Sequence, residues 1–211
     1  MSTVNTYANC TNAILTFTSV IASSQTVNFN AFLTDFSQTF ASNWNSEEVF
    51  GRMDAIAIFK NTRRTISLAW DVPAEDYGEA TTNLSKSNKL IKMLYPAYMT
   101  SAPINKSLEG SELSRNDTTL QTNAQSLSKP PLVKVKYANL IQNSAKPGDG
   151  LLGWIDNLNI KPVIDMGYFH GSNNLYPKVI SISCNFNVLH QHSLGFDGAK
   201  QNWLGGSDFP F

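Results

Sequence analysis

VISISCNFNVL, residues 179–189, is the clearest structural signal in the chain, because every second residue from Ile180 to Val188 is apolar. Successive side chains of a β-strand point to opposite faces, so this alternation predicts a strand with one buried and one polar face. The buried face would carry Ile180, Ile182, Cys184, Phe186 and Val188, and the polar face Ser181, Ser183, Asn185 and Asn187. We expect the polar face to meet water or a polar lumen.

Several apolar and β-branched runs before residue 179 predict further strands. The runs span residues 11–22, 27–44, 55–59, 65–72, 132–141 and 151–165. The first is expected to form one strand or a strand pair, and residues 27–44 a long, bent strand with an aromatic face. Residues 60–64 separate two of the runs and are interpreted as a hairpin or bulged turn. The sequence therefore predicts a mainly β (α+β) fold.

One segment, residues 74–94, has the period of an α-helix. Its stripe at three- and four-residue steps consists of Tyr77, Ala80, Leu84, Ser87, Ile91 and Leu94. Pro73 precedes it and Pro96 follows it, as is common at helix ends. We expect one flanking helix whose stripe faces the core.

Two long segments are expected to act as arms of a single domain that spans residues 1–195. Residues 99–131 contain no aromatic residue and no clear period, which is typical of a functional insertion. Residues 196–211 carry exposed aromatic area, including Trp203, Phe209 and Phe211, that a neighbouring subunit would cover. Deletion of the Phe209–Phe211 end is expected to impair assembly and leave the isolated fold intact.

The composition disfavours several classes of function. The 16 basic and 16 acidic residues cancel, so no net positive field draws the chain to nucleic acid or to a membrane. No run of about 18 apolar residues and no signal-like start occurs, and the expected place of synthesis is the cytoplasm. Cys10 and Cys184 lack CxxC or metal-type spacing, so neither a disulfide framework nor a cofactor is expected.

Candidate chemistry is sparse. His190 and His192 flank Gln191 at the end of a predicted strand, and His170 would be a third metal ligand. No acidic residue at helical spacing and no HExxH supports that site, and we favour polar strand-end histidines. No pair of carboxylates has a spacing that predicts a catalytic site, and no GxSxG, Walker loop or GxGxxG occurs. We therefore expect that the chain is not an enzyme.

Charged and aromatic residues are instead interpreted as contacts between subunits. Glu47 and Glu48 lie close to Arg52, which suggests surface ion pairs or intersubunit contacts. Lys60, Arg63 and Arg64 form a basic cluster that is interpreted as a solvated turn, with phosphate binding as the alternative. The expected interface residues are Trp44, Glu47, Glu48, Arg52, Arg63, Arg64, Trp203, Phe209 and Phe211.

Several ordered motifs resemble baseplate and tail-tube-associated proteins of contractile-tailed bacteriophages. Residues 44–74, WNSEEVFGRMDAIAIFKNTRRTISLAWDVPA, approximate W-x-S-E-x-V-x-G-R-x-D-x-I followed by T-R-x-I, and residues 94–98, LYPAY, close the following helix. PPLVKVKYANLI, GLLGWIDNLNIKPVIDMGYF and YPKVISISCNFNVLHQHSLG also resemble later strands of that group. Ala55 departs from the pattern, because Pro is more typical after the Asp.

The resemblance implies a tail-tube-like β-sandwich or barrel that assembles into a hexameric ring at the junction of tail tube and baseplate. Such a subunit would initiate the tube or adapt it to the hub. Its partners would be the tube, hub, wedge, sheath and tape-measure proteins, and DNA would pass through the ring without specific binding. A virion location follows. The alternatives are a tail completion or terminator ring protein, a small metal-dependent hydrolase that uses the three histidines, and a carbohydrate-binding β-sandwich with Trp44, Trp154 or Trp203 as stacking platforms.

Overall fold

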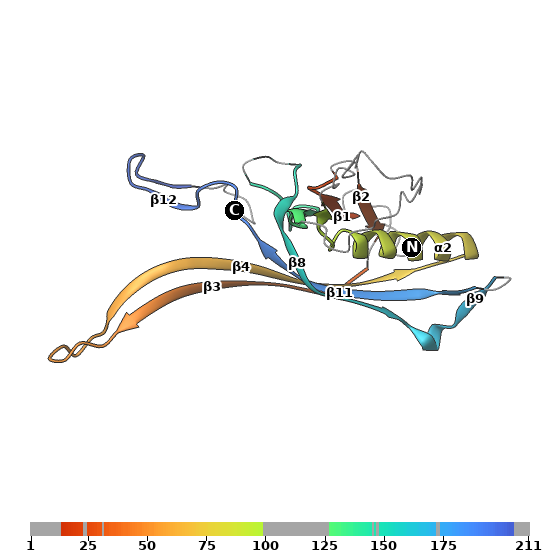
Figure 1. The fold of residues 1–211 in the computed structure, drawn as a ribbon, viewed down its shortest axis with the longest axis horizontal. Coiled ribbons are helices and arrows are strands. Elements are labelled where there is room, and N and C mark those ends of the chain that lie inside the picture. The colour runs from red at the N-terminus through yellow and green to blue at the C-terminus, as the bar shows by residue number, and fades with distance from the viewer. Residues whose placement is uncertain are drawn as a thin grey trace, which may run out of the picture.

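The computed structural model describes residues 14–22, 25–30, 32–98, 127–144, 146, 148–171 and 174–204. Within these ranges the protein is mainly β, with one large antiparallel sheet and one α-helix (Figure 1). This confirms the predicted fold class. Residues 99–126, Phe209 and Phe211 lie outside the described residues, and so do most of the predicted insertion and the end of the predicted C-terminal arm.

Seven strands form the main sheet in the order β2-β1-β7-β8-β11-β4-β3. They are β1 Ile14–Ser19, β2 Thr26–Asn30, β3 Phe32–Glu47, β4 Ile56–Pro73, β7 Val133–Tyr137, β8 Leu151–Pro162 and β11 Val179–Val188. Three small hairpins pair β5 Ala97–Tyr98 with β6 Leu127–Lys129, β9 Tyr168–His170 with β10 Leu175–Pro177, and β12 Gly195–Asp197 with β13 Asn202–Leu204. A short 3-10 helix, η1, spans Ile164–Met166.

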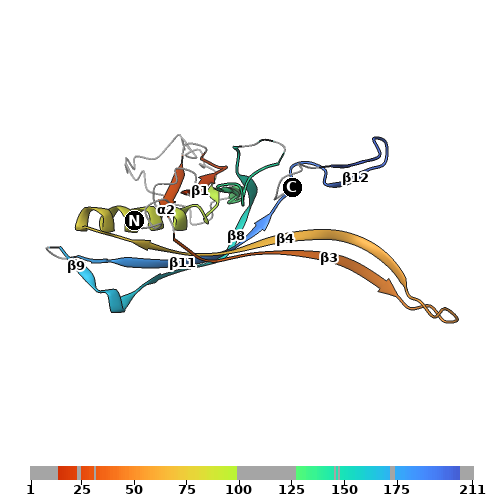
Figure 2. The ribbon, with the colours of Figure 1, turned by 180° about the vertical axis from the view of Figure 1, so that it is seen from behind.

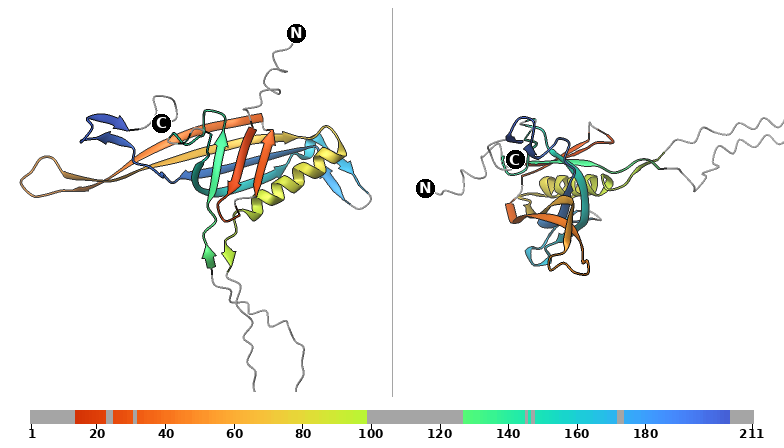
Figure 3. Two further views of the ribbon diagram at one scale, coloured as in Figure 1. Left: turned by 90° about the horizontal axis from the view of Figure 1, so that it is seen from above. Right: turned by 90° about the vertical axis from the view of Figure 1, so that its left-hand side faces the viewer.

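The sheet curls back on itself, so that strands from its two ends face each other across the core. β2 and β3 lie at opposite ends of the strand order, although a single residue separates Asn30 from Phe32. Phe17 of β1 stacks on Trp70 of β4 with 5.6 Å between ring centroids, which brings the two layers into contact. In Figure 3, β1, β2 and β7 run across the direction of β4 and β11. The fold is therefore a sandwich of two crossed layers made from one sheet.

β11 lies inside this sheet, and its buried and partly exposed residues alternate as the sequence predicts. Ile180, Ile182, Cys184, Phe186 and Val188 are buried in the core. The core also includes buried residues of β1, β2, β4 and β7, such as Phe17, Phe29, Trp70 and Val135. The alternation of one strand thus predicts the core side of the sheet correctly.

β8 connects the two layers at Gly153. This residue pairs with Val133 of β7 on one side and with Val188 of β11 on the other. A Cβ atom at position 153 would overlap the carbonyl oxygen of Asn187 and come within 2.7 Å of the Phe186 ring. Only glycine fits where the strand turns from one layer into the other.

The prediction of one long strand at residues 27–44 is wrong, because this range belongs to two strands in different layers, β2 up to Asn30 and β3 from Phe32. Phe29 of β2 is buried, whereas Phe32 of β3 is exposed at the far edge of the sheet. The aromatic residues on either side of this change belong to different strands. Their regular spacing in the sequence therefore suggested one continuous aromatic face of a single strand.

The prediction of a turn at residues 60–64 is also wrong, because these residues continue β4. Residues 61–64 pair with residues 40–43 of β3, and a bulge between Asn43 and Trp44 accommodates Lys60. The strands beyond the core are exposed on both faces, so polar residues there do not mark a turn. The connection between β3 and β4 instead lies at residues 48–55, at the far end of the long hairpin in Figures 1 and 2.

The single helix of the described chain, α2, spans Tyr77–Lys92 and confirms the predicted helix with shorter bounds. It begins at Asp76, whose Oδ1 accepts a hydrogen bond from the Glu79 amide at 2.6 Å. The prediction that its apolar stripe faces the core is only partly correct. Ala80 and Ser87 are buried, but Leu84 and Ile91 are exposed, because Asn83 and Leu90 complete the buried face instead.

We predict that Gly153→Ala lowers the free energy of unfolding by about 2–3 kcal/mol, because the added methyl group forces the Asn187 backbone and the Phe186 ring apart. Urea unfolding monitored by circular dichroism measures the change. Gly198→Ala, in the turn before β13, has open space around its Cβ position and should change stability by less than about 0.5 kcal/mol. Equal effects of the two substitutions would contradict the assigned role of Gly153.

Candidate assembly surface

The long β3–β4 hairpin extends past the rest of the sheet, and we call residues 40–63 the arm. β4 leaves its partner β11 at Thr65, so beyond that point β3 and β4 pair only with each other among the described strands. Every described residue of β4 from Ile56 to Arg63 is exposed. Among the described residues, the two strands of the arm therefore extend beyond the core, and most of their side chains are exposed on both faces.

The face of β4 that forms the core continues outward as the aromatic face of the arm. Residues directly opposite each other in an antiparallel pair share a face, and Phe40 lies opposite Arg64 while Trp44 lies opposite Phe59. Phe40, Trp44 and Phe59 are each about half exposed. An apolar stripe that is buried in the domain thus continues into solvent along the arm.

The aromatic face has an ordered geometry of its own. Trp44 and Phe59 meet edge to face with 5.2 Å between ring centroids. Trp44 Nε1 donates a hydrogen bond to Ser42 Oγ at 2.9 Å, which orients the indole. A surface with fixed side chains loses little conformational entropy on binding, which favours association.

Arg64 holds the base of the arm from inside the protein. It is only 3% exposed, and its Nε and Nη2 both donate to Gln38 Oε1, at 3.1 and 2.8 Å. The guanidinium carbon lies 5.4 Å from the centroid of the Phe40 ring, a cation–π distance. Because Arg64 is buried, it is not a surface contact residue, and the sequence-based interface prediction is wrong for this position.

The predicted interface residues Trp44, Glu47, Glu48, Arg52 and Arg63 all belong to the arm or to its tip. The tip, residues 48–55, also exposes Phe50 and Met53 fully. Sequence reasoning missed these two residues. Their signal was the presence of two large apolar side chains among the charged residues of a connection between strands.

A second apolar projection lies near the arm. β12 and β13 form a hairpin in which Phe196 and Trp203 meet edge to face at 5.5 Å, and Trp203 is 77% exposed. Figures 1 and 3 show this hairpin on the same end of the molecule as the arm. The predicted C-terminal arm therefore begins as a short hairpin with an exposed aromatic pair.

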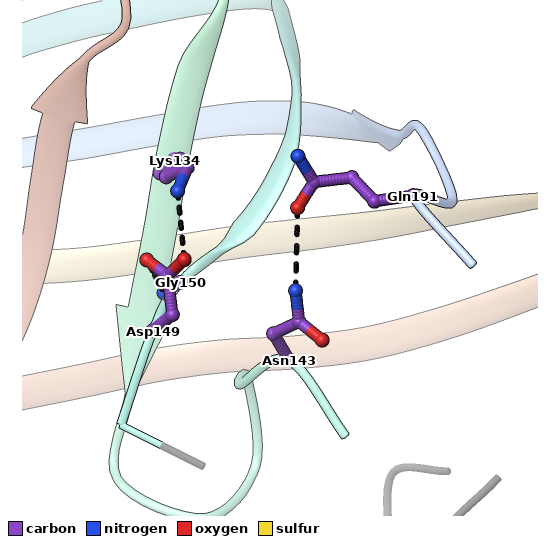
Figure 4. Close-up of polar contacts among 5 residues, drawn as sticks. All are labelled: Lys134, Asn143, Asp149, Gly150 and Gln191. Carbon is purple, nitrogen blue, oxygen red and sulfur yellow. Dashed lines mark hydrogen bonds and ion pairs between the residues drawn. The ribbon is translucent and has the colours of Figure 1, made fainter. Parts of the chain in front are cut away.

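Polar contacts fix the root of this second hairpin (Figure 4). Asn143 Nδ2 donates to Gln191 Oε1 at 3.2 Å, and Gln191 lies between the end of β11 at Val188 and the start of β12 at Gly195. Near the same loop, Lys134 Nζ lies 2.7 Å from Asp149 Oδ2. The hydrogen bond from Lys134 lowers the pKa of Asp149 below its usual value, because it favours the ionised carboxylate.

The three histidines of the metal hypothesis do not come together. His170 ends β9, next to the start of β11, whereas His190 and His192 follow the other end of β11. The ten residues of β11 separate the two places by about 33 Å at 3.3 Å per residue. No group of three metal-ligating side chains occurs in the described ranges.

Two further groups bear on the enzymatic alternative. Ser144 Oγ lies 3.0 Å from His192 Nε2, which is the spacing of a nucleophile and its base. His192 Nδ1 is buried without a hydrogen-bond partner among the described residues, so no carboxylate there orients the ring. Burial raises the pKa of the Cys184 thiol to about 12, so this group stays protonated at neutral pH.

The opposite face of β4 and β11 is polar and largely uncharged at its centre. Thr65 Oγ1 donates to Asn187 Oδ1 at 3.1 Å, and Ser67 Oγ donates to Asn185 Oδ1 at 3.0 Å. In these cross-strand hydrogen bonds, the polar side chains of β4 and β11 satisfy one another. The centre of this face therefore presents uncharged polar groups, while Asp71, Asp156 and Lys161 lie on the same face further along the strands.

No protein-family model matches the chain, and no curated protein matches it either. The described part of the chain holds no helix with the length and apolar character that crossing a membrane requires.

We predict that Arg64→Met raises the pKa of His190. Burial is the main cause that lowers the pKa of His190, and the positive charges of Arg64 and His192 lower it further. Removal of the Arg64 charge should therefore reverse part of the shift. Titration of the His190 ring protons by NMR measures it. Arg63→Met lies on the other face of β4 and should leave the His190 pKa unchanged.

The same shift makes stability depend on pH. Folded His190 resists protonation, so below about pH 6.5 the unfolded chain binds more protons and stability falls as the pH falls. In Arg64→Met this decrease should be shallower. An unchanged His190 pKa in Arg64→Met would show that the Arg64 charge does not act on the ring.

Proposed function

We propose that the protein is a structural subunit of a contractile phage tail, which forms a ring at the junction of tail tube and baseplate and carries out no catalysis. In this role it initiates the tube or adapts it to the hub. Its partners are copies of itself, the tube protein and baseplate proteins, and DNA passes through the ring without specific binding.

The observation that carries the proposal is the aromatic face of the arm. Monomeric proteins rarely leave a contiguous apolar surface of this kind uncovered, and such surfaces usually mark protein contacts. Here the surface combines Phe40, Trp44 and Phe59 with the fully exposed tip residues Phe50 and Met53. A long projection that carries its own apolar face is suited to bind a neighbouring subunit.

The sequence motifs and the polar face also support the proposal. Residues 44–74, which carry most of the resemblance to tail proteins, form the tip of the arm and the whole of β4. The centre of the face with Thr65, Ser67, Asn185 and Asn187 is uncharged, and the charged residues paired beside it, Asp71, Asp156 and Lys161, include a single basic group. Such a surface suits a channel wall, because DNA binds most strongly where basic groups neutralise its phosphates.

We predict that the wild-type protein forms rings and that the double variant Phe50→Ser, Met53→Ser stays mostly monomeric. Burial of a Phe or Met side chain contributes about 1.5–3 kcal/mol, and about 1.4 kcal/mol changes an association constant tenfold, so we expect a loss of at least about a hundredfold. Analytical ultracentrifugation measures association, and negative-stain images show the rings.

Val20→Ser serves as the matched control, because Val20 is an exposed apolar residue at the turn between β1 and β2, away from the arm. Melting temperatures should be similar for all three proteins. If the double variant still assembles like the wild type, the arm does not drive association. A wild-type protein that stays monomeric at all concentrations and binds zinc or a glycan would instead support one of the other classes.

The place in the particle needs a separate measurement. A nanogold label on this chain in intact particles should appear at the baseplate end of the tail. A label at the head end would contradict the baseplate assignment and support a terminator ring.

A further inference from the structure

We propose that the tip of the arm of one copy docks in an apolar groove between α2 and β8 of the next copy. This inference rests on the proposed function, because it names the surface that receives the arm when copies associate. It is independent of where in the tail the ring lies.

The groove has a volume of about 500 Å³ and is open to solvent. Its lining residues are Thr81, Leu84, Ser85, Ser87, Asn88 and Ile91 of α2 and Ile160 of β8. Leu84 and Ile91 are each 38% exposed, although both are large apolar residues. The groove therefore presents apolar side chains that nothing in the described chain covers.

The helix leaves these residues exposed because polar contacts fix its orientation. Asn83 Nδ2 donates to the carbonyl oxygen of Pro73 at 3.1 Å, at the end of β4. Ser87 Oγ donates to the Asn83 carbonyl oxygen at 2.9 Å, so a buried hydroxyl is satisfied within the helix. With Asn83 and Ser87 turned to the core, Leu84 and Ile91 lie beside the core face and line the groove.

The tip of the arm fits this groove in size. Phe50 and Met53 are the two most exposed apolar side chains of the described residues. An apolar cavity of about 150 Å³ is large enough for one benzene ring. A groove of about 500 Å³ can therefore accept the Phe50 ring together with the Met53 side chain.

The tip is acidic, whereas the helix surface beside the groove is basic. The tip, residues 48–55, contains Glu48 and Asp54 but one basic residue, Arg52, which gives a net charge of −1, and Glu47 next to it adds a further negative charge. On α2, Lys89 and Lys92 lie four residues after the groove residues Ser85 and Asn88, one turn along the helix surface, and both line a second pocket at the C-terminal end of the helix. Opposite charges around an apolar contact favour one docking orientation.

A second copy is the occupant because the two surfaces lie at opposite ends of one chain. In Figures 1 and 2 the arm extends from one end of the molecule, while α2 lies at the other end. The arm of a copy thus points away from its own groove. A contact between two different surfaces of identical chains is heterologous, and such contacts close into a ring when the rotation between copies allows it.

The test uses disulfide formation between two variants of the full chain in a Cys10→Ser background. One carries Met53→Cys at the tip, which keeps Phe50, and the other carries Asn88→Cys in the groove, which keeps Leu84 and Ile91. Cys184 is buried and should not react. After mixing under ring-forming conditions and mild oxidation, a non-reducing gel should show a linked dimer of the two variants.

Met166→Cys is the matched control for the groove variant, because Met166 is exposed on η1 and does not line the groove. We expect several-fold more linked dimer with Asn88→Cys than with Met166→Cys. Leu84→Asp, a change at an exposed position, should lower this yield and weaken association without lowering the melting temperature.

Equal yields for both partners, or no linked dimer, would overturn the inference. Rings that form without the Met53–Asn88 link would show that the groove is wrong while the proposed function stands. Absence of both rings and link would contradict the proposed function as well.

Discussion

The length of β4 relative to the core is the constraint on which the rest of the structure depends. Residues 65–73 pair with β11 and alternate between the core and the polar face, so that Ile66, Leu68 and Trp70 are buried. The strand does not stop where the core stops. Because it pairs with β3 over its whole length, the same alternation continues beyond the described core and produces a half-exposed aromatic face on the arm.

The transition between core and arm depends on a buried charge. Arg64 lies at the first core-facing position beyond Ile66, and Gln38 Oε1 accepts hydrogen bonds from its Nε and Nη2. A buried cation is costly unless it is hydrogen-bonded, so the Gln38 amide and the Phe40 ring together keep the guanidinium in place. This fixes the direction of the arm at its root. A rigid root suits the role that we propose for the arm, which is to reach a defined place on a neighbouring copy.

The sequence predicted the parts of the fold in which polarity reports burial. β11 was predicted almost to its ends, because one of its faces is buried and the other is polar. On the arm both faces are exposed, so the polar residues 60–64 were interpreted as a turn although they continue β4. On α2 the buried residues Asn83 and Ser87 form local hydrogen bonds, which a hydrophobic pattern does not reveal. The candidate assembly surface was predicted in part, because the resemblance drew attention to Trp44 and Arg52. The burial of Arg64 and the exposure of Phe50 and Met53 depend on tertiary structure, which the sequence pattern does not reveal.

The central claim is that a neighbouring subunit covers the arm in the assembled protein. Amide hydrogen exchange, compared between dilute monomer and assembled protein, tests it most directly, because beyond Thr65 the two strands of the arm pair only with each other among the described strands and lie outside the core. The account predicts slower exchange on assembly at residues 40–63, while β1 and β7 inside the domain stay unchanged. Assembly that leaves exchange in residues 40–63 as fast as in the monomer would contradict it.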